Sequence, residues 1–127
     1  MRIVPIRALL ALAYTAGVLA LTALPGRTVA RWGFTGVLLD LLHIPLFTGL
    51  TLVTLWSVVG SRTQRLFLVV TAIAVFAAAD EGLQHWVPGR VASLGDFARD
   101  IVGVAIGVVI VEGLGPLAIA WRGESQR

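Results

Sequence analysis

Residues 80–107 read DEGLQHWVPGRVASLGDFARDIVGVAIG, a segment that combines ionisable side chains with stretches apolar enough for a membrane interior. Four of the seven acidic residues of the chain lie in it. A charge at membrane depth is costly, and ionisable groups are kept there mainly where they pair or serve a function. The segment therefore marks where we expect a functional site.

The rest of the chain is more apolar still. Its 127 residues are 57% hydrophobic and 13% charged, whereas soluble domains carry about 25% charged residues. A chain this short buries only part of its surface, so this composition indicates an integral membrane protein. All ten basic residues are Arg, and they are scattered at the edges of apolar runs, which argues against binding to nucleic acid. The absence of Cys excludes disulfides, zinc–thiolate sites and thiol catalysis.

The apolar runs predict an all-α membrane protein with four transmembrane helices, at approximately 6–24, 37–61, 66–87 and 94–114. A spanning helix needs roughly 17–25 residues, and each run falls within that length. Segments this apolar must satisfy their own backbone hydrogen bonds in lipid, which favours helices. No linker separates the runs, so residues 1–127 are predicted to form one small bundle and a single domain.

Four spans would place both termini on one side of the membrane, together with the loop at 61–65. Six Arg residues fall on that side and four on the other. The six are Arg2, Arg7, Arg62, Arg65, Arg122 and Arg127, and the four are Arg27, Arg31, Arg90 and Arg99. Because positive charge marks the cytoplasmic side, we expect a multi-pass protein of the cytoplasmic (inner) membrane with both termini in the cytoplasm. A signal peptide over 1–30 is the alternative, but its apolar core would be unusually long.

This topology brings polar residues from three segments to one membrane level on the extracytoplasmic side. The predicted binding residues are Asp40, His43, Asp80, Glu81, Gln84, Arg90, Ser93, Asp96, Arg99 and Asp100. Spacings of three and four residues, as in Asp40 and His43 or Asp80 and Gln84, place side chains on a shared helix face. Their coincidence at one depth favours a site over a set of unrelated polar residues.

The fourth predicted helix carries Asp96, Asp100, Gly103 and Gly107 on one stripe. The glycine spacing predicts helix packing, because small residues let membrane helices approach closely. The acids on the same stripe should then face the bundle. Ser93 is a predicted N-cap, with Asp96 as the acid of a capping box.

Each of these residues also has a purely structural explanation. Capping accounts for Asp96, and ion pairing with neighbouring acids accounts for Arg90 and Arg99. His43 and His85 show no recognised metal-ligand spacing, so the sequence predicts no metal site and no cofactor. The tryptophans are typical of membrane-interface anchors rather than ligand platforms: Trp32, Trp56, Trp86 and Trp121.

Residues 80–107 resemble the signature of the VanZ-like family, small multi-helix membrane proteins named after a teicoplanin-resistance accessory protein. The matching positions are Asp80, Glu81, Gln84, Val87, Pro88, Gly89, Arg90, Ser93 and Asp96, followed by Gly103 and Gly107. A second motif of the family is similar to His43, Phe47 and Leu50. The chain departs from the family where Leu41 replaces a common Lys and Asp100 a frequent Asn. Asp40 also lies one residue closer to the histidine, and we expect Arg90 or Arg99 to balance the charge of Asp100.

The resemblance implies a cell-envelope protein whose outward polar site engages lipid headgroups, a lipid-linked cell-wall precursor or an amphiphilic antibiotic, with teicoplanin resistance as one outcome. Arg90 and Arg99 would meet anionic groups, since guanidinium matches phosphate and carboxylate geometry.

An intramembrane acid–base enzyme acting on lipid-linked envelope substrates is the alternative, because two acids with a nearby histidine could transfer protons. Ser93 is the one obvious nucleophile, so no catalytic residue is assigned. An ion-conducting bundle ranks last, since it needs ionisable residues through the whole membrane depth. The sequence does not decide whether the chain forms a homo-oligomer.

Overall fold

The computed structural model describes the backbone of residues 1–33 and 36–124 and the side chains up to residue 114. Trp121, Arg122 and Arg127, which entered the sequence argument, have side chains outside the described part. The elements in chain order are β1 (Arg2–Ile3), α1 (Pro5–Thr22), α2 (Gly26–Arg31), α3 (Gly36–Ser57), β2 (Val58–Val59), α4 (Arg62–Gln84) and α5 (Leu94–Glu124).

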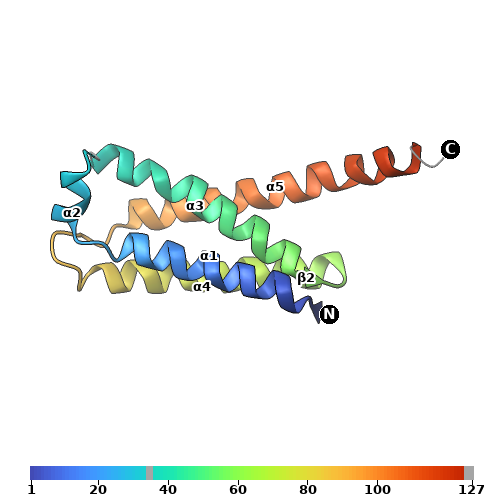
Figure 1. The fold of residues 1–127 in the computed structure, drawn as a ribbon, viewed down its shortest axis with the longest axis horizontal. Helices are drawn as coiled ribbons and strands as arrows, with labels where there is room; N and C mark the ends of the chain where they lie inside the picture. Colours follow the sequence, from blue (N-terminus) through green and yellow to red (C-terminus); the bar gives the residue numbers. More distant parts are fainter. Residues whose placement is uncertain (34–35, 125–127) are drawn as a thin grey trace.

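The four long helices form an elongated bundle in which the chain reverses direction at two opposite ends (Figure 1). At one end lie α2 and the loop between α4 and α5, and at the other lie β1, β2 and the turn into α4. Helix α3 is central, because it contacts α1, α4 and α5. The later part of α5 extends beyond the other helices (Figure 1).

Within the part of the chain that the structure describes, three helices are long and apolar enough to cross a membrane: Pro5–Thr22, Gly36–Ser57 and Arg62–Gln84. They correspond to the first three predicted spans. The fourth predicted span, 94–114, falls on the first part of α5, whose apolar run is interrupted by Asp96, Arg99 and Asp100 near its start and by Glu112 further on. The chain is thus mostly helical with three helices of membrane-spanning length and composition.

The helix bounds differ from the predicted ones in ways that local residues explain. Pro5 opens α1, where its fixed φ and missing N–H fit the first turn of a helix. The second predicted helix extends to 61, but α3 ends at Ser57, because the next residues pair with the start of the chain. In this antiparallel pair Arg2 lies opposite Val59 and Ile3 opposite Val58. Helix α2 and this short β-pair were not predicted.

Close packing between α3 and α5 defines the core. A Cβ atom added at Gly103 would lie 2.5 Å from the carbonyl oxygen of Ile44, and one at Gly107 would lie 2.7 Å from Cβ of Thr51. Thr48 Oγ1 also donates a hydrogen bond of 3.0 Å to the Gly103 carbonyl. The predicted role of the two glycines in helix packing thus matches their position against α3.

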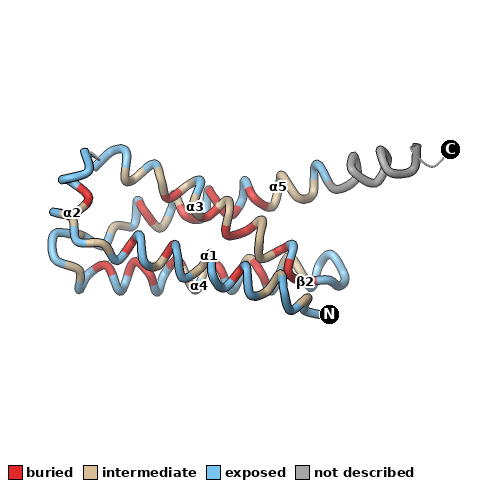
Figure 2. Tube along the Cα trace, in the orientation of Figure 1, coloured by how far each residue is buried: buried red, intermediate tan, exposed pale blue. Residues whose placement is uncertain are grey.

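The outer surface of the bundle is apolar. Figure 2 shows the buried residues along the inner sides of the helices, with exposed residues on the outer sides. The exposed side chains include Leu9, Phe67, Val75 and Val109, at 61–73% exposure. Monomeric soluble proteins rarely expose so much contiguous apolar surface, so this surface suits contact with lipid tails.

The end of the bundle that holds β1 and β2 carries its own charged groups. Glu112 of α5 forms ion pairs with Arg62 and Arg65 of α4. Arg7 lies over the ring of Trp56, 4.7 Å from its centroid. Glu112 therefore lies at the opposite end of the bundle from the acids at the start of α5, and Trp56 makes a cation–π contact with Arg7.

Candidate functional site

The start of α3, the end of α4 and the start of α5 lie at one end of the bundle (Figure 1), and polar residues from all three line a common cavity there. The loop between α4 and α5 turns tightly, with Arg90 N–H donating to the Val87 carbonyl and Gly89 at a φ of +79°. This left-handed backbone is one that glycine adopts at little cost. Gly26 N–H donates to the Pro88 carbonyl at 3.2 Å, which ties the loop to α2. The loop is thereby fixed over the helix ends.

Helix α4 contributes two buried carboxyl groups and a buried amide. Asp80 is 1% exposed, and its Oδ1 accepts a hydrogen bond of 2.7 Å from Thr22 Oγ1 of α1. Gln84 Nε2 donates to Asp80 Oδ2 at 3.2 Å and to Glu81 Oε1 at 3.4 Å. The spacing of three and four residues along α4 thus places all three side chains in one hydrogen-bonded group.

His43 of α3 and Asp100 of α5 form a buried pair. Asp100 Oδ1 lies 2.8 Å from His43 Nδ1, and Asp100 is fully buried. With Asp100 ionised, the carboxylate would accept this hydrogen bond from His43 in the tautomer that carries a proton on Nδ1. The His43 ring also stacks on Phe47, 6.5 Å between centroids. The expectation that Arg90 or Arg99 balances Asp100 was therefore wrong, because the helix rotation turns Asp100 toward His43.

The two arginines of the predicted site have different environments. Arg99 pairs with Asp96 one turn earlier and lies 3.8 Å from Asp40 Oδ2 of α3. Arg90 donates from Nε to the Leu24 carbonyl at 3.4 Å. Within the described part of the chain it forms no ion pair, so the expected pairing with acids holds for Arg99 and not for Arg90.

The start of α5 is capped by Ser93 of the preceding loop, whose own N–H is bound by Glu81 of α4. Ser93 Oγ accepts the Gly95 N–H at 3.1 Å, as an N-cap residue does. In a capping box the acid three residues later accepts the N–H of the cap. Here Glu81 of α4 accepts the Ser93 N–H at 2.9 Å, while Asp96 turns to Arg99.

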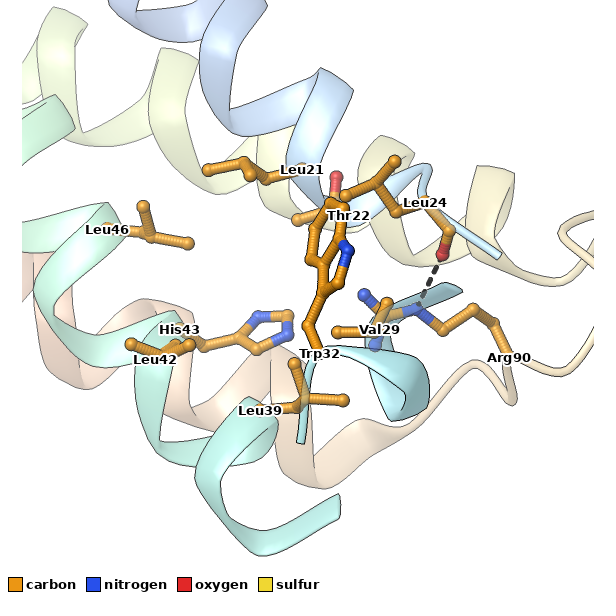
Figure 3. A pocket seen from close by; sticks show the side chains of 10 residues that line it. All are labelled: Leu21, Thr22, Leu24, Val29, Trp32, Leu39, Leu42, His43, Leu46 and Arg90. Atoms are coloured by element: carbon orange, nitrogen blue, oxygen red, sulfur yellow. Dashed lines mark hydrogen bonds between the residues drawn. The ribbon is translucent and has the colours of Figure 1, made fainter. Parts of the chain in front are cut away.

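Two cavities meet at this end of the bundle. The first, of about 310 Å³, is almost entirely apolar and lies between α1, α2 and α3 (Figure 3). Its walls include Leu21, Trp32, Leu42, His43, Leu46 and Arg90. The second, of about 510 Å³, is lined by polar groups that include Asp40, Gln84, Arg90, Ser93, Asp96 and Arg99. Leu39 and Arg90 line both cavities.

Arg90 and His43 thus face the apolar cavity from different sides. Figure 3 shows the His43 ring and the Trp32 indole extending into the space between the helices, with Arg90 bonded to the Leu24 carbonyl at its edge. Trp32 was interpreted as an interface anchor, but here it is a cavity wall.

Three buried side chains could hold a metal ion. Ligand atoms of His43, Glu81 and Asp100 all lie within 4.8 Å of one another. The sequence indicated no metal site, because the three residues come from three helices and share no local spacing. Their proximity depends on how α3, α4 and α5 rotate about their axes.

The structure thus brings the ten predicted binding residues to one end of the bundle, although not all of them touch. His85 is exposed and packs edge-on against Trp86, so it lies outside this group. The sequence did not predict three residues that line or contact the site: Thr22, Leu24 and Trp32. The one signal in the sequence is that they lie at or just after the end of the apolar run of α1, at the same end of the bundle as the predicted site. No family model, curated protein or solved structure matches this chain.

Proposed function

We propose that this chain is a VanZ-like protein of the cell envelope that binds an amphiphile with an anionic headgroup at the end of the bundle formed by α2 and the α4–α5 loop. The observation that supports it is the pair of cavities, one apolar and one polar, that share Leu39 and Arg90. A ligand with its apolar part in the first and its charged part in the second would fit both.

Arg90 is the residue best suited to the headgroup. It lines both cavities, and its guanidinium is engaged by one carbonyl oxygen and no carboxylate among the described residues. A guanidinium offers five donors in a fork that matches phosphate or carboxylate. Arg99 is already held by Asp96 and Asp40, so it would act as a second, weaker contact.

The apolar cavity gives room for part of a hydrocarbon tail. Its volume of about 310 Å³ is at the lower end of ligand pockets. Each methylene removed from water contributes about 0.8 kcal/mol, and a tail can extend from the cavity into the bilayer. The candidate ligands share this chemistry: an anionic lipid, a lipid-linked cell-wall precursor or an amphiphilic antibiotic such as teicoplanin.

In this proposal α5 is a fourth span, both termini lie in the cytoplasm and the two cavities open at the outer leaflet of the cytoplasmic membrane. The ion pairs of Glu112 with Arg62 and Arg65 support the fourth span, because they compensate the charge of α5 at the opposite end. The excess of Arg on the side of the termini supports the orientation.

Binding to nanodiscs tests the proposal. Purified protein in zwitterionic nanodiscs is titrated with a polyprenyl phosphate and with the uncharged polyprenol of equal length. We expect the phosphate to bind and the Arg90→Ala variant to weaken it at least tenfold. Arg31→Ala is the matched control, because Arg31 is exposed on α2 at the same end and lines neither cavity. Equal binding by Arg90→Ala and wild type would contradict the proposal.

The His43–Asp100 pair supports a second candidate function, the acid–base enzyme. A histidine oriented by a buried carboxylate is the arrangement of a general base, and His43 lines the apolar cavity. Incubation of the nanodiscs with the same polyprenyl phosphate, followed by mass spectrometry, should then reveal a product that His43→Gln abolishes. An unchanged ligand after long incubation with wild type would count against catalysis on this substrate.

A further inference from the structure

We infer that His43, Glu81 and Asp100 form a binding site for a divalent transition-metal ion such as Zn²⁺. The three residues lie on α3, α4 and α5, and all three are buried. This inference rests on the side-chain cluster alone and does not depend on the proposed binding of an amphiphile.

The distances suit a single ion. One ligand atom from each residue lies within 4.8 Å of the other two. Zinc binds nitrogen and carboxylate oxygen at about 2.0–2.2 Å in tetrahedral geometry, so two ligand atoms of one ion lie about 3.3–3.6 Å apart. Binding therefore requires the three ligand atoms to move together by about 1 Å, a distance on the scale of side-chain rotation.

Asp100 provides an independent indication. Its Oδ1 is hydrogen-bonded to His43, whereas its Oδ2 is buried and accepts no hydrogen bond from any described residue. Buried carboxylate oxygens normally have partners, and each exception needs an explanation such as an ion. A cation bound beside this carboxylate supplies the partner that the protein does not.

The charge balance points the same way. Among the residues described, Asp80 and Glu81 form no ion pair, and Asp100 pairs with His43 only. The two arginines that line the polar cavity are engaged elsewhere, Arg99 with Asp96 and Arg90 with a carbonyl group. Three buried carboxylates beside one histidine, when ionised, are unfavourable in the interior of a membrane protein, and a bound cation would stabilise this ionised form.

Both carboxylate oxygens of Glu81 accept hydrogen bonds from neighbouring residues, as the side chains of metal ligands commonly do. Ser93 N–H donates to Glu81 Oε2 at 2.9 Å and Gln84 Nε2 donates to Oε1 at 3.4 Å. Such outer contacts orient ligating side chains and are a regular part of metal sites. Asp80 holds Gln84 in turn, at 3.2 Å.

The ligand set selects the class of metal. Imidazole combined with carboxylate suits zinc, manganese or iron, whereas calcium and magnesium prefer oxygen ligands throughout. Three protein ligands also leave a coordination position open. Access exists on two sides, because His43 lines the apolar cavity and Glu81 lines a separate cavity of about 420 Å³ with Ser93 and Phe97.

The test uses full-length protein purified through a tag without histidine, stripped with chelator and reconstituted in nanodiscs. Titration with Zn²⁺ should give one ion per chain in the wild type. Glu81→Gln and Asp100→Asn should each weaken binding at least tenfold. Glu112→Gln and His85→Ala, which change an acid and a histidine outside the cluster, should bind as the wild type does. A wild type that binds no stoichiometric zinc overturns the inference, as does wild-type affinity in Glu81→Gln.

X-ray absorption at the zinc edge keeps the test decisive if the cluster variants fail to fold. The chain has two histidines, so imidazole scattering in His85→Ala protein must come from His43. We expect one imidazole and otherwise oxygen ligands. A zinc shell without imidazole in that variant would show that the ion binds elsewhere.

Discussion

Glu81 of α4 accepts the backbone N–H of Ser93 at 2.9 Å, so the last turn of one helix caps the first turn of the next. The side chain of Ser93 completes the cap by accepting the Gly95 N–H. A cap supplied by a neighbouring helix fixes the loop at both ends, and with it the position of Arg90. The same carboxylate belongs to the buried cluster with His43 and Asp100.

Replacement of Glu81 should separate these roles. Glu81→Ala removes the acceptor of the Ser93 N–H and a partner of Gln84, and unsatisfied buried groups cost about 1–3 kcal/mol each. Glu81→Gln keeps one acceptor oxygen and should lose less stability. Thermal unfolding in detergent compares both with Gln64→Ala, which alters an exposed residue of the same helix. Equal melting temperatures for Glu81→Ala and Gln64→Ala would show that the cap is unimportant.

The contact between α3 and α5 should be sensitive to single methyl groups. In Gly103→Ala the new Cβ would lie 2.5 Å from the Ile44 carbonyl oxygen, so the helices must separate. Overpacking of this kind costs about 1–3 kcal/mol. Gly113→Ala is the matched control, because its Cβ would have no neighbour within 4 Å. A melting temperature lowered in Gly103→Ala and not in Gly113→Ala is the expected result, and the reverse order would contradict this packing.

The buried pair of His43 and Asp100 should be strongly coupled. His43→Ala leaves the Asp100 carboxylate without its one recorded partner, and breaking a buried pair costs about 3–5 kcal/mol. Asp100→Asn in the same chain removes the uncompensated charge and should restore part of that loss. A double-mutant cycle on free energies of unfolding measures the coupling. Additive effects of the two changes would mean that the pair does not exist in the membrane.

The sequence predicted the end of the bundle at which the site lies, but not the contacts within it. The order and length of the apolar runs indicate how deep in the membrane each residue lies. Asp80, Glu81 and Asp100 could therefore be assigned to one membrane level from the sequence. His43 and Asp100 are 57 residues apart in the sequence, and they meet only because of the way α3 and α5 are rotated about their axes. These helices are apolar on nearly all sides, so their hydrophobic pattern does not specify that rotation. The glycine stripe was the exception, because small residues mark the contacting face.

The ends of the helices were predicted less well, for a local reason. The pairing of Ile3 with Val58 draws two apolar residues out of the helical run, and no helix-breaking residue marks Ser57 as an end. Likewise α5 continues to Glu124 through Gly113 and Pro116, ten residues past the end at 114 that the sequence predicted. Apolar runs predict which segments are helical, whereas tertiary contacts decide where they end.

The apolar cavity should control the binding of amphiphiles. Leu42→Trp adds a large ring to its wall and should lower affinity for the polyprenyl phosphate at least tenfold. Leu41→Trp is the matched control, because Leu41 is the adjacent residue of α3 and is 52% exposed on the outside of the bundle. The nanodisc titration measures both variants. Equal affinity in the two would place the tail of the ligand outside this cavity.

Antibiotic susceptibility tests the envelope role in cells. A Gram-positive host that produces the wild type should tolerate a higher teicoplanin concentration than the host with an empty vector. Arg90→Ala combined with Asp96→Asn should abolish that protection, because the first change removes the cation proposed to meet the headgroup and the second removes the acid that fixes the position of Arg99 in the polar cavity. Arg31→Ala should protect as the wild type does, at membrane levels matched by immunoblot. Protection by the double variant would separate any resistance from this polar end, and failure of the wild type at good expression would remove teicoplanin from the candidate ligands.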